Sequence, residues 1–286
     1  MQEFERQAQA FASQIEDELQ EGRLNFPTAL DVSLRIKRLA DNPESTMEEI
    51  AAAVRAEPVL SAKAVRMANA VLLNPYGRPV TSVNEAVKRI GLSALRCLAF
   101  AVAAEQLAQD HRSRQMRLVA SGLWMHSVDV AAWSYALARH LCTVRPDTAM
   151  LAGIMIDIGQ FFLLARAADY PALEENMSRF AEFVSTWEEP VGRAILEAFE
   201  LPEAIVDAFQ YEDPYAGNWP PENLSDIVFI ATLATDTPNP FDSLLGLDNR
   251  AALRDTCIAG LDRSKYDELL EAAQAGRQEL LAAVVG

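Results

Sequence analysis

The feature that most restricts the fold is a long apolar stripe between residues 113 and 141. Its side chains recur at alternating steps of three and four, at Val119, Leu123, His126, Val130, Trp133, Leu137 and Leu141. Such steps place all of these side chains on one face of an α-helix. The stripe therefore predicts a long helix over 113–140 in which His126 lies on the buried face.

Helix signals recur along the rest of the chain. Thr46-x-x-Glu49 and Ser82-x-x-Glu85 are capping boxes, in which a hydroxyl and a carboxylate satisfy the first backbone N–H groups of a helix. Further apolar stripes predict helices within 1–21, 93–109, 146–168, 173–187, 191–199, 202–211, 224–234 and 251–285. No stretch shows the two-residue alternation of a strand. We therefore expect an all-α fold in two helical layers that divide near residues 109–113.

Composition limits the expected partners and compartment. The chain has 286 residues, of which 41 are acidic and 25 are Lys or Arg, and its formal net charge is −16. A surface this acidic repels phosphate backbones and anionic lipid, so we expect no direct nucleic-acid or membrane binding. The basic residues Arg35, Lys37 and Arg38 are interpreted as a solvated helix face. Widely spaced cysteines, no apolar leader and no uncharged apolar run of about 18 residues favour a cytoplasmic protein.

One charge stands in the apolar segment 149–160, which reads AMLAGIMIDIGQ. That charge is Asp157, and an ionised carboxylate in such surroundings costs several kcal/mol unless it is paired, hydrogen-bonded or bound to a metal. The credible partner is His126, because the other two histidines are expected elsewhere: His111 at an exposed position and His140 at a helix end.

His126 and Asp157 alone are too few for a catalytic metal site, which needs about three protein ligands. The carboxylates that could complete a site are Glu188, Glu189, Glu212 and Asp213. The alternative is a buried hydrogen bond between His126 and Asp157 that ties two core helices together, and we favour this structural interpretation. No phosphate-binding loop, nucleophile elbow or dinucleotide fingerprint occurs in the sequence.

Five segments carry a resemblance to a known family. They are Glu57-Pro58-Val59-Leu60-Ser61-Ala62-Lys63 with Arg66, Ala68 and Asn69; Val80-Thr81-Ser82-Val83-Asn84-Glu85-Ala86-Val87 with Ile90-Gly91; Trp124-Met125-His126-Ser127; Leu151 to Gly159; and Leu201-Pro202-Glu203-Ala204-Ile205-Val206 with Tyr211. In this order they resemble the signature segments of the HDOD domain, the HD-related output domain of bacterial signalling proteins. The resemblance runs from about Phe26 to Asp213. It implies an HD-domain-like multi-helical bundle with an N-terminal helical layer. From the helix pattern of the whole sequence we expect a division into 1–112, 113–236 and a linker with tail helices at 237–286.

The departures from the family pattern bear on function. Metal-dependent HD phosphohydrolases use a His-Asp doublet and further histidines, but here Ile156 stands at the doublet histidine. The later histidine positions hold Glu188, Glu212, Asp213 and Phe229. Only His126 and Asp157 remain, as the remnant of a degenerate metal site, so the resemblance implies no enzyme activity, no bound metal and no cofactor. Asn69 is interpreted as a buried side chain that caps a helix or bonds between helices.

These observations favour a regulatory protein of bacterial signal transduction. Its expected partners are a histidine kinase, a response regulator or a cyclic-dinucleotide enzyme, contacted through protein–protein interaction. A first alternative is a divergent metal-dependent HD phosphohydrolase acting on a nucleotide or cyclic dinucleotide, with His126 and Asp157 among the ligands. A second alternative is a small-ligand sensor that uses the cleft between the two helical halves.

Overall fold

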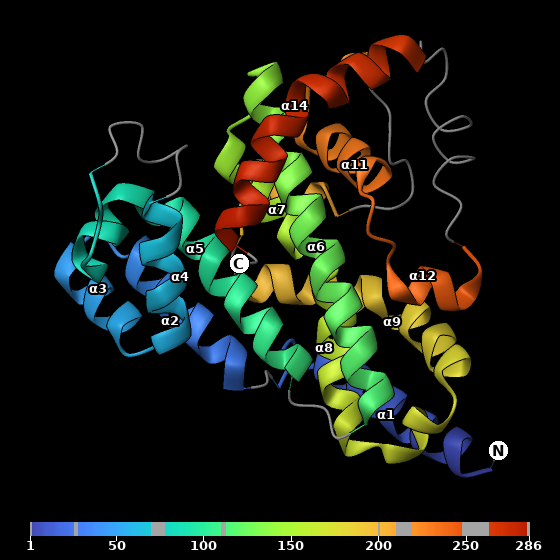
Figure 1. Ribbon diagram of the computed structural model, residues 1–286. Helices are drawn as coiled ribbons and strands as arrows, with labels where there is room; N and C mark the ends of the chain where they lie inside the picture. Colours follow the sequence, from blue (N-terminus) through green and yellow to red (C-terminus); the bar gives the residue numbers. More distant parts are fainter. Residues whose placement is uncertain are drawn as a thin grey trace.

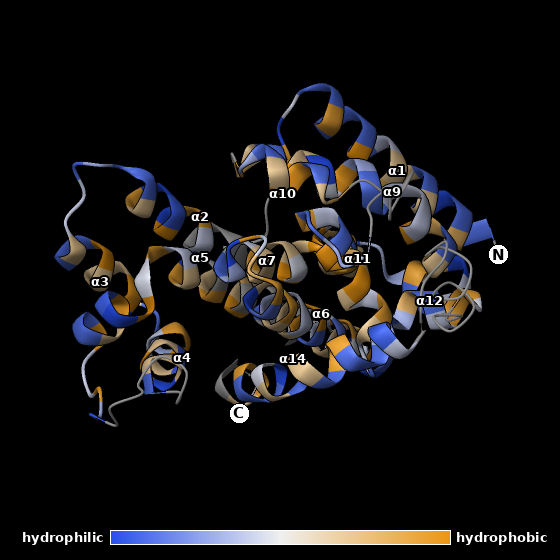
Figure 2. Cartoon of the chain, turned by 90° about the horizontal axis from the view of Figure 1, so that it is seen from above, coloured by the Kyte–Doolittle hydropathy of each residue, from blue (hydrophilic) through white to orange (hydrophobic). Residues whose placement is uncertain are grey.

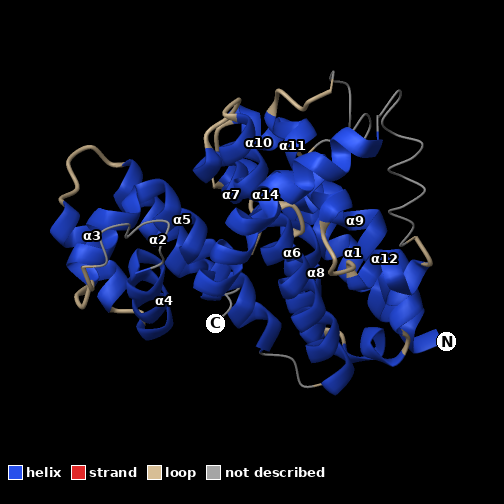
Figure 3. Cartoon of the chain, turned by 45° about the horizontal axis from the view of Figure 1, so that its top comes forward, coloured by secondary structure: helices blue, strands red, loops and turns tan. Residues whose placement is uncertain are grey.

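The computed structural model describes residues 2–25, 28–69, 78–109, 113–199, 201–209, 219–247 and 263–284. Within these ranges every regular element is a helix, as Figure 3 shows. The expectation of an all-α fold is therefore confirmed. Five residues considered from the sequence lie outside the described residues: Phe26, His111, Tyr211, Glu212 and Asp213.

A first group of helices contains α2 (Thr28–Asp41), α3 (Met47–Arg55), α4 (Pro58–Asn69) and the first part of α5 (Val83–Gln109). The predicted capping box at Thr46 is present: Glu49 N donates to Thr46 Oγ1 at 3.2 Å, and Thr46 N donates to Glu49 Oε2 at 2.7 Å. Gly91 divides α5 into two helical parts with a φ of +79°, a conformation that glycine adopts without strain, so the helix expected over 93–109 follows a kink. Beyond the kink α5 reaches the remaining helices and joins the two groups, which lie side by side in Figure 2.

The second group is built around α6 (Arg114–Leu141), the predicted long helix, which begins after the N-cap Ser113. Its other elements are α7 (Pro146–Met155), α8 (Ile158–Arg166), α9 (Met177–Ala198), α10 (Glu203–Asp207), α11 (Leu224–Ala234), α12 (Pro240–Leu245), α14 (Arg263–Val284) and the 3₁₀ turns η1 (Ala167–Asp169) and η2 (Pro171–Glu175). The helices α7, α11 and α14 all contact α6 (Figure 1). As predicted, α6 buries the side chain of His126.

The N-terminal helix α1 (Gln2–Gln20) packs on the second group, although it precedes the first group in sequence (Figure 1). Phe11 stacks on Tyr170 with ring centroids 4.7 Å apart. Glu18 receives two hydrogen bonds from the guanidinium of Arg166, at 3.0 and 3.2 Å. These contacts attach α1 to α8 and to the turns that follow it. The domain boundaries expected from the sequence stay predictions.

The helix α9 runs through a proline at which the sequence predicts a break. Pro190 lies inside α9, so the two helices expected at 173–187 and 191–199 form one helix that starts at Met177. Proline removes one backbone N–H donor from the helix. Next to Pro190, α9 packs closely against α8. A Cβ atom at Gly159 of α8 would lie 2.1 Å from the carbonyl oxygen of Glu188. The backbones of α8 and α9 are therefore in direct contact just before the proline.

The tail helix α14 is attached to both groups. Arg277 donates to the two carboxylate oxygens of Asp129 on α6, at 2.7 and 2.9 Å, and its guanidinium lies 4.9 Å from the centre of the Trp133 ring. Near the end of α14, Arg66 of α4 donates to the carbonyl oxygen of Ala282 at 2.6 Å. The tail thus packs on the core, a point that the sequence left open.

The segment Pro146–Asp169 is long and apolar enough to cross a membrane, by length and composition alone. It comprises α7, α8 and η1, interrupted at Ile156 and Asp157, and 83% of its most apolar window is buried inside the protein. Core helices of soluble proteins have the same properties, so the segment is weak evidence for a membrane span.

We expect Arg277→Met to lower the free energy of unfolding by about 3–5 kcal/mol, because it leaves the buried Asp129 carboxylate without its cation. The double variant Asp129→Asn/Arg277→Met should recover most of this loss, since it removes the stranded charge. Urea unfolding followed by circular dichroism measures both. Equal stability of the two variants would mean that the ion pair does not hold α14.

Candidate functional site

Asp157 lies in the two-residue turn between α7 and α8, with 5% of its surface exposed. Both carboxylate oxygens have donors: Ser127 Oγ of α6 donates to Oδ2 at 2.5 Å, and Asn239 Nδ2 donates to Oδ1 at 3.1 Å. Burial raises the pKa of the carboxyl group, and the neighbouring His126 opposes that rise. Asp157 is therefore a buried acid whose hydrogen bonds are supplied by protein groups.

His126 is held by the backbone rather than by Asp157. Its Nδ1 lies 2.7 Å from the carbonyl oxygen of Thr237, and because a carbonyl only accepts, Nδ1 carries the proton and donates. Its Nε2 lies 3.9 Å from Asp157 Oδ2, which is too long for a hydrogen bond. The structure brings the two residues together, but the direct hydrogen bond expected between them is not formed.

Asn239 is the residue that sequence reasoning missed. Its Nδ2 donates to Asp157 Oδ1 at 3.1 Å and to Gln160 Oε1 at 2.9 Å, while its Oδ1 accepts from Phe241 N at 2.9 Å. The sequence around it was interpreted as a linker, yet Asn239 is the N-cap of α12 and Pro240 the first residue of that helix. An Asn-Pro pair at the start of an apolar run is the signal that could have indicated the cap.

Glu188 on α9 ends the polar network. Gln160 Nε2 donates to Glu188 Oε2, so the network runs from Asp157 through Asn239 and Gln160 to this carboxyl group. The pKa of Glu188 is raised to about 7. Burial is the largest cause of this rise; the hydrogen bond from Gln160 opposes the rise, and the charge of Asp157 adds to it. Glu188 is thus linked to Asp157 through two amide side chains.

The arrangement does not form a metal centre within the described residues. No group of three or more His, Cys, Asp or Glu side chains is placed there to hold an ion. Ile156, at the position of the doublet histidine, offers no donor atom for a metal. An ion could bind His126 through Nε2 while Nδ1 keeps its hydrogen bond to Thr237, but together with Asp157 that gives two protein ligands, fewer than a metal centre needs.

The segment 235–239, which joins α11 to α12, covers this part of α6. Thr237 accepts from His126, Asn239 donates to Asp157, and Thr235 Oγ1 donates to Asp129 Oδ2 at 2.6 Å. His126, Asp157, Gln160 and Asn239 are each only 5–6% exposed. A substrate would therefore reach the polar network only after the covering segment had moved. We call 235–239 the covering segment below.

Two residues of the N-terminal signature segments contribute contacts rather than a site. Asn69 bonds to both the N–H and the carbonyl oxygen of Val80, each at 2.8 Å, and so fixes the chain where it returns towards α5. Its side chain is exposed, so the expectation of a buried asparagine is wrong. Lys63 of α4 lies 5.8 Å from the Trp124 ring of α6, and joins the two groups of helices.

We expect Asp157→Asn to keep most of the stability, since an amide oxygen can still accept one of the two hydrogen bonds. Asp157→Leu should cost about 2–4 kcal/mol, because Asn239 and Ser127 then point buried donors at an apolar side chain. Chemical denaturation of both variants decides. Equal losses would contradict the view of Asp157 as the acceptor that ties these elements together.

The raised pKa of Glu188 makes stability depend on pH. The folded chain binds the proton more tightly than the unfolded chain, whose pKa is near 4.5, so the stabilisation is complete below pH 4.5 and is lost as the pH rises to about 7. The free energy of unfolding should therefore fall by up to about 3 kcal/mol over this pH range, and Glu188→Gln should abolish that fall. Unfolding curves between pH 4.5 and 7.5 measure it, with Glu182→Gln, at an exposed position of α9 outside the network, as the control. The same slope in both variants would exclude Glu188 as its source.

Comparison with known proteins identifies the family of this chain. The model of the HDOD domain matches residues 26–214, and no curated protein matches the sequence. Among solved structures, the chain is similar to a "Putative metal-dependent phosphohydrolase" from Shewanella amazonensis SB2B, at 21% identity and a TM-score of 0.68 over 98% of this chain and 100% of that one. It is also similar to an "HDOD domain protein with unknown function" from Geobacter sulfurreducens, at 23% identity and a TM-score of 0.57 over 94% and 97% of the two chains. These likenesses confirm the HD-domain-like bundle, and the match over 26–214 shows that the chain belongs to the HDOD-domain family.

Proposed function

We propose that this chain is a non-catalytic regulatory protein that acts by binding other proteins of a bacterial signalling pathway. The observation that carries the proposal is the closed polar network at the former metal position. Asp157 has protein donors on both oxygens, His126 donates to the backbone, and Ile156 replaces a ligand. Such a network stabilises helices, and within the described residues it offers an ion two ligands, fewer than a catalytic metal site needs.

The wider setting of the proposal follows from what the HDOD resemblance implies about partners and from composition. A histidine kinase, a response regulator or a cyclic-dinucleotide enzyme is the expected kind of partner, and the absence of paired cysteine spacing in the sequence supports a cytoplasmic setting. The net charge of −16 favours protein partners over nucleic acid or anionic membranes. A protein of this kind would bind its partner through its surface, and the buried network would serve only to fix the positions of the helices that form that surface.

Metal analysis and a hydrolysis panel test the proposal. We expect the chain, purified from medium supplemented with Mn²⁺, Fe²⁺ and Zn²⁺, to hold far less than one transition-metal ion per molecule. It should not hydrolyse bis(p-nitrophenyl) phosphate or cyclic dinucleotides in the presence of those ions, because the described part of the chain supplies too few ligands. An active HD phosphohydrolase serves as the positive control. Stoichiometric metal, together with hydrolysis that Asp157→Asn abolishes in a folded protein, would overturn the proposal and assign an enzyme.

A further inference from the structure

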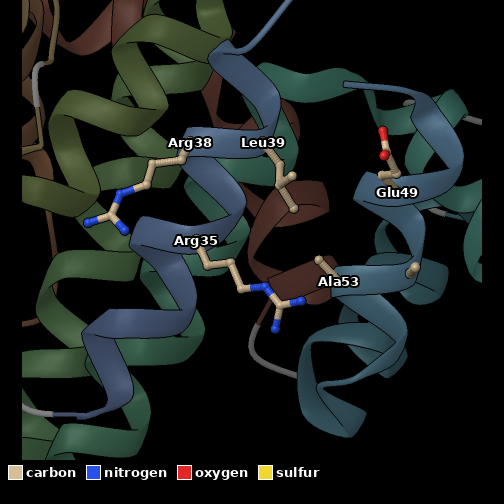
Figure 4. A pocket seen from close by; sticks show the side chains of 6 residues that line it. Arg35, Arg38, Leu39, Glu49 and Ala53 are labelled. Carbon is tan, nitrogen blue, oxygen red and sulfur yellow. The ribbon is translucent and has the colours of Figure 1, made fainter. Parts of the chain in front are cut away.

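A groove opens between α2 and α3 in the first group of helices. It has a volume of about 460 Å³ and is lined by Arg35, Arg38, Leu39, Glu49, Ala52 and Ala53. Figure 4 shows Leu39 pointing into the space between the two helices, Arg35 reaching from α2 towards α3, and Arg38 extending from the other side of α2. The groove therefore has an apolar floor and the guanidinium of Arg35 at its margin, while the guanidinium of Arg38 lies nearby on the far side of α2.

The three neighbouring cations of α2 have different surroundings. Lys37 is buried, contrary to its interpretation as part of a solvated face, and lies 2.8 Å from Asp41, which also pairs with Arg96. Arg35 and Arg38 are exposed, and no described carboxylate lies within ion-pair distance of either. The cation that points into the protein is neutralised, while the two at the groove are available to a partner.

The one acidic residue of the groove does not neutralise these arginines. Glu49 accepts hydrogen bonds from the backbone N–H of Thr46 at 2.7 Å and from its hydroxyl at 3.0 Å, as part of the capping box of α3. Its carboxylate is thus engaged at the start of its own helix. The groove therefore keeps a local positive charge beside its apolar floor, although the net charge of the chain is −16.

We propose that this groove binds an acidic amphipathic segment of a partner protein. An apolar side chain of the segment would cover Leu39 and Ala53, and flanking carboxylates would pair with Arg35 and Arg38. Guanidinium groups bind carboxylates through two parallel hydrogen bonds, and a helix laid in an apolar groove is a common mode of peptide recognition. A small anion would use the arginines but gain nothing from the apolar floor, and a cationic segment would be repelled. This inference rests on the proposed regulatory function and names the chemistry of the partner.

The test selects peptides from a phage-displayed library of random 16-residue sequences on the immobilised full-length chain. We expect the enriched peptides to carry Asp or Glu beside Leu, Ile or Phe. The best peptide should bind Arg35→Glu/Arg38→Glu about tenfold or more weakly than the unchanged protein at low salt, and added salt should weaken binding to the unchanged protein. The control, Arg114→Glu/Arg139→Glu, changes two exposed arginines at the ends of α6 and alters the net charge equally. It should bind within about twofold of the unchanged protein.

A second pair of variants tests the groove without touching the arginines. Ala52→Glu places a bulky anion on the groove wall and should weaken binding, whereas Ala62→Glu, on an exposed face of α4 outside the groove, should not. The proposal fails if no peptide is enriched, if the enriched peptides lack acidic residues, or if Arg35→Glu/Arg38→Glu binds them unchanged. Sedimentation adds one more check: self-association that this double variant abolishes would assign the groove to a second copy and overturn the proposal. None of these failures affects the metal and hydrolysis test, so the two proposals are separable.

Discussion

The need to satisfy one buried carboxylate organises this protein. Asp157 sits in the turn between two apolar helices, where an ionised or protonated acid without partners would cost several kcal/mol. Its donors come from Ser127 on α6 and Asn239 before α12, so one side chain joins three parts of the chain that are far apart in sequence. The same bonds draw the covering segment over His126. Asp157 therefore links these three parts of the chain through its hydrogen bonds.

A second buried acid, Asp129, lies on α6 itself and also joins distant parts of the chain. Asp129 accepts from Thr235 in the covering segment and from Arg277 on α14, and thereby attaches the end of the chain to the central helix. Both the covering segment and α14 lie beyond residue 214, where the match to the HDOD model ends. The part of the chain outside the family match thus supplies hydrogen-bond partners to His126 and Asp157. The face that carries Arg35 and Arg38 belongs to the other group of helices and stays open.

Local features of the structure could be predicted from the sequence, whereas long-range ones could not. The cap at Thr46, the long helix with its buried His126, and the buried acid Asp157 follow from patterns within a few turns of chain. The role of Asn239 depends on a partner 82 residues away, and no periodicity reports such a contact. The sequence predicts two helices over 173–187 and 191–199, whereas Pro190 lies inside the single helix α9; the close approach of Gly159 to this helix is visible only in three dimensions.

The most direct measurement of the central claim is an anomalous difference map from crystals of the full chain soaked in Mn²⁺. If the polar network has replaced a metal site, the map shows no peak within coordination distance of His126 Nε2 and Asp157, and Asn239 still donates to Asp157. A strong peak between those two side chains, with the covering segment displaced, would contradict the account and restore a metal-binding role to the site.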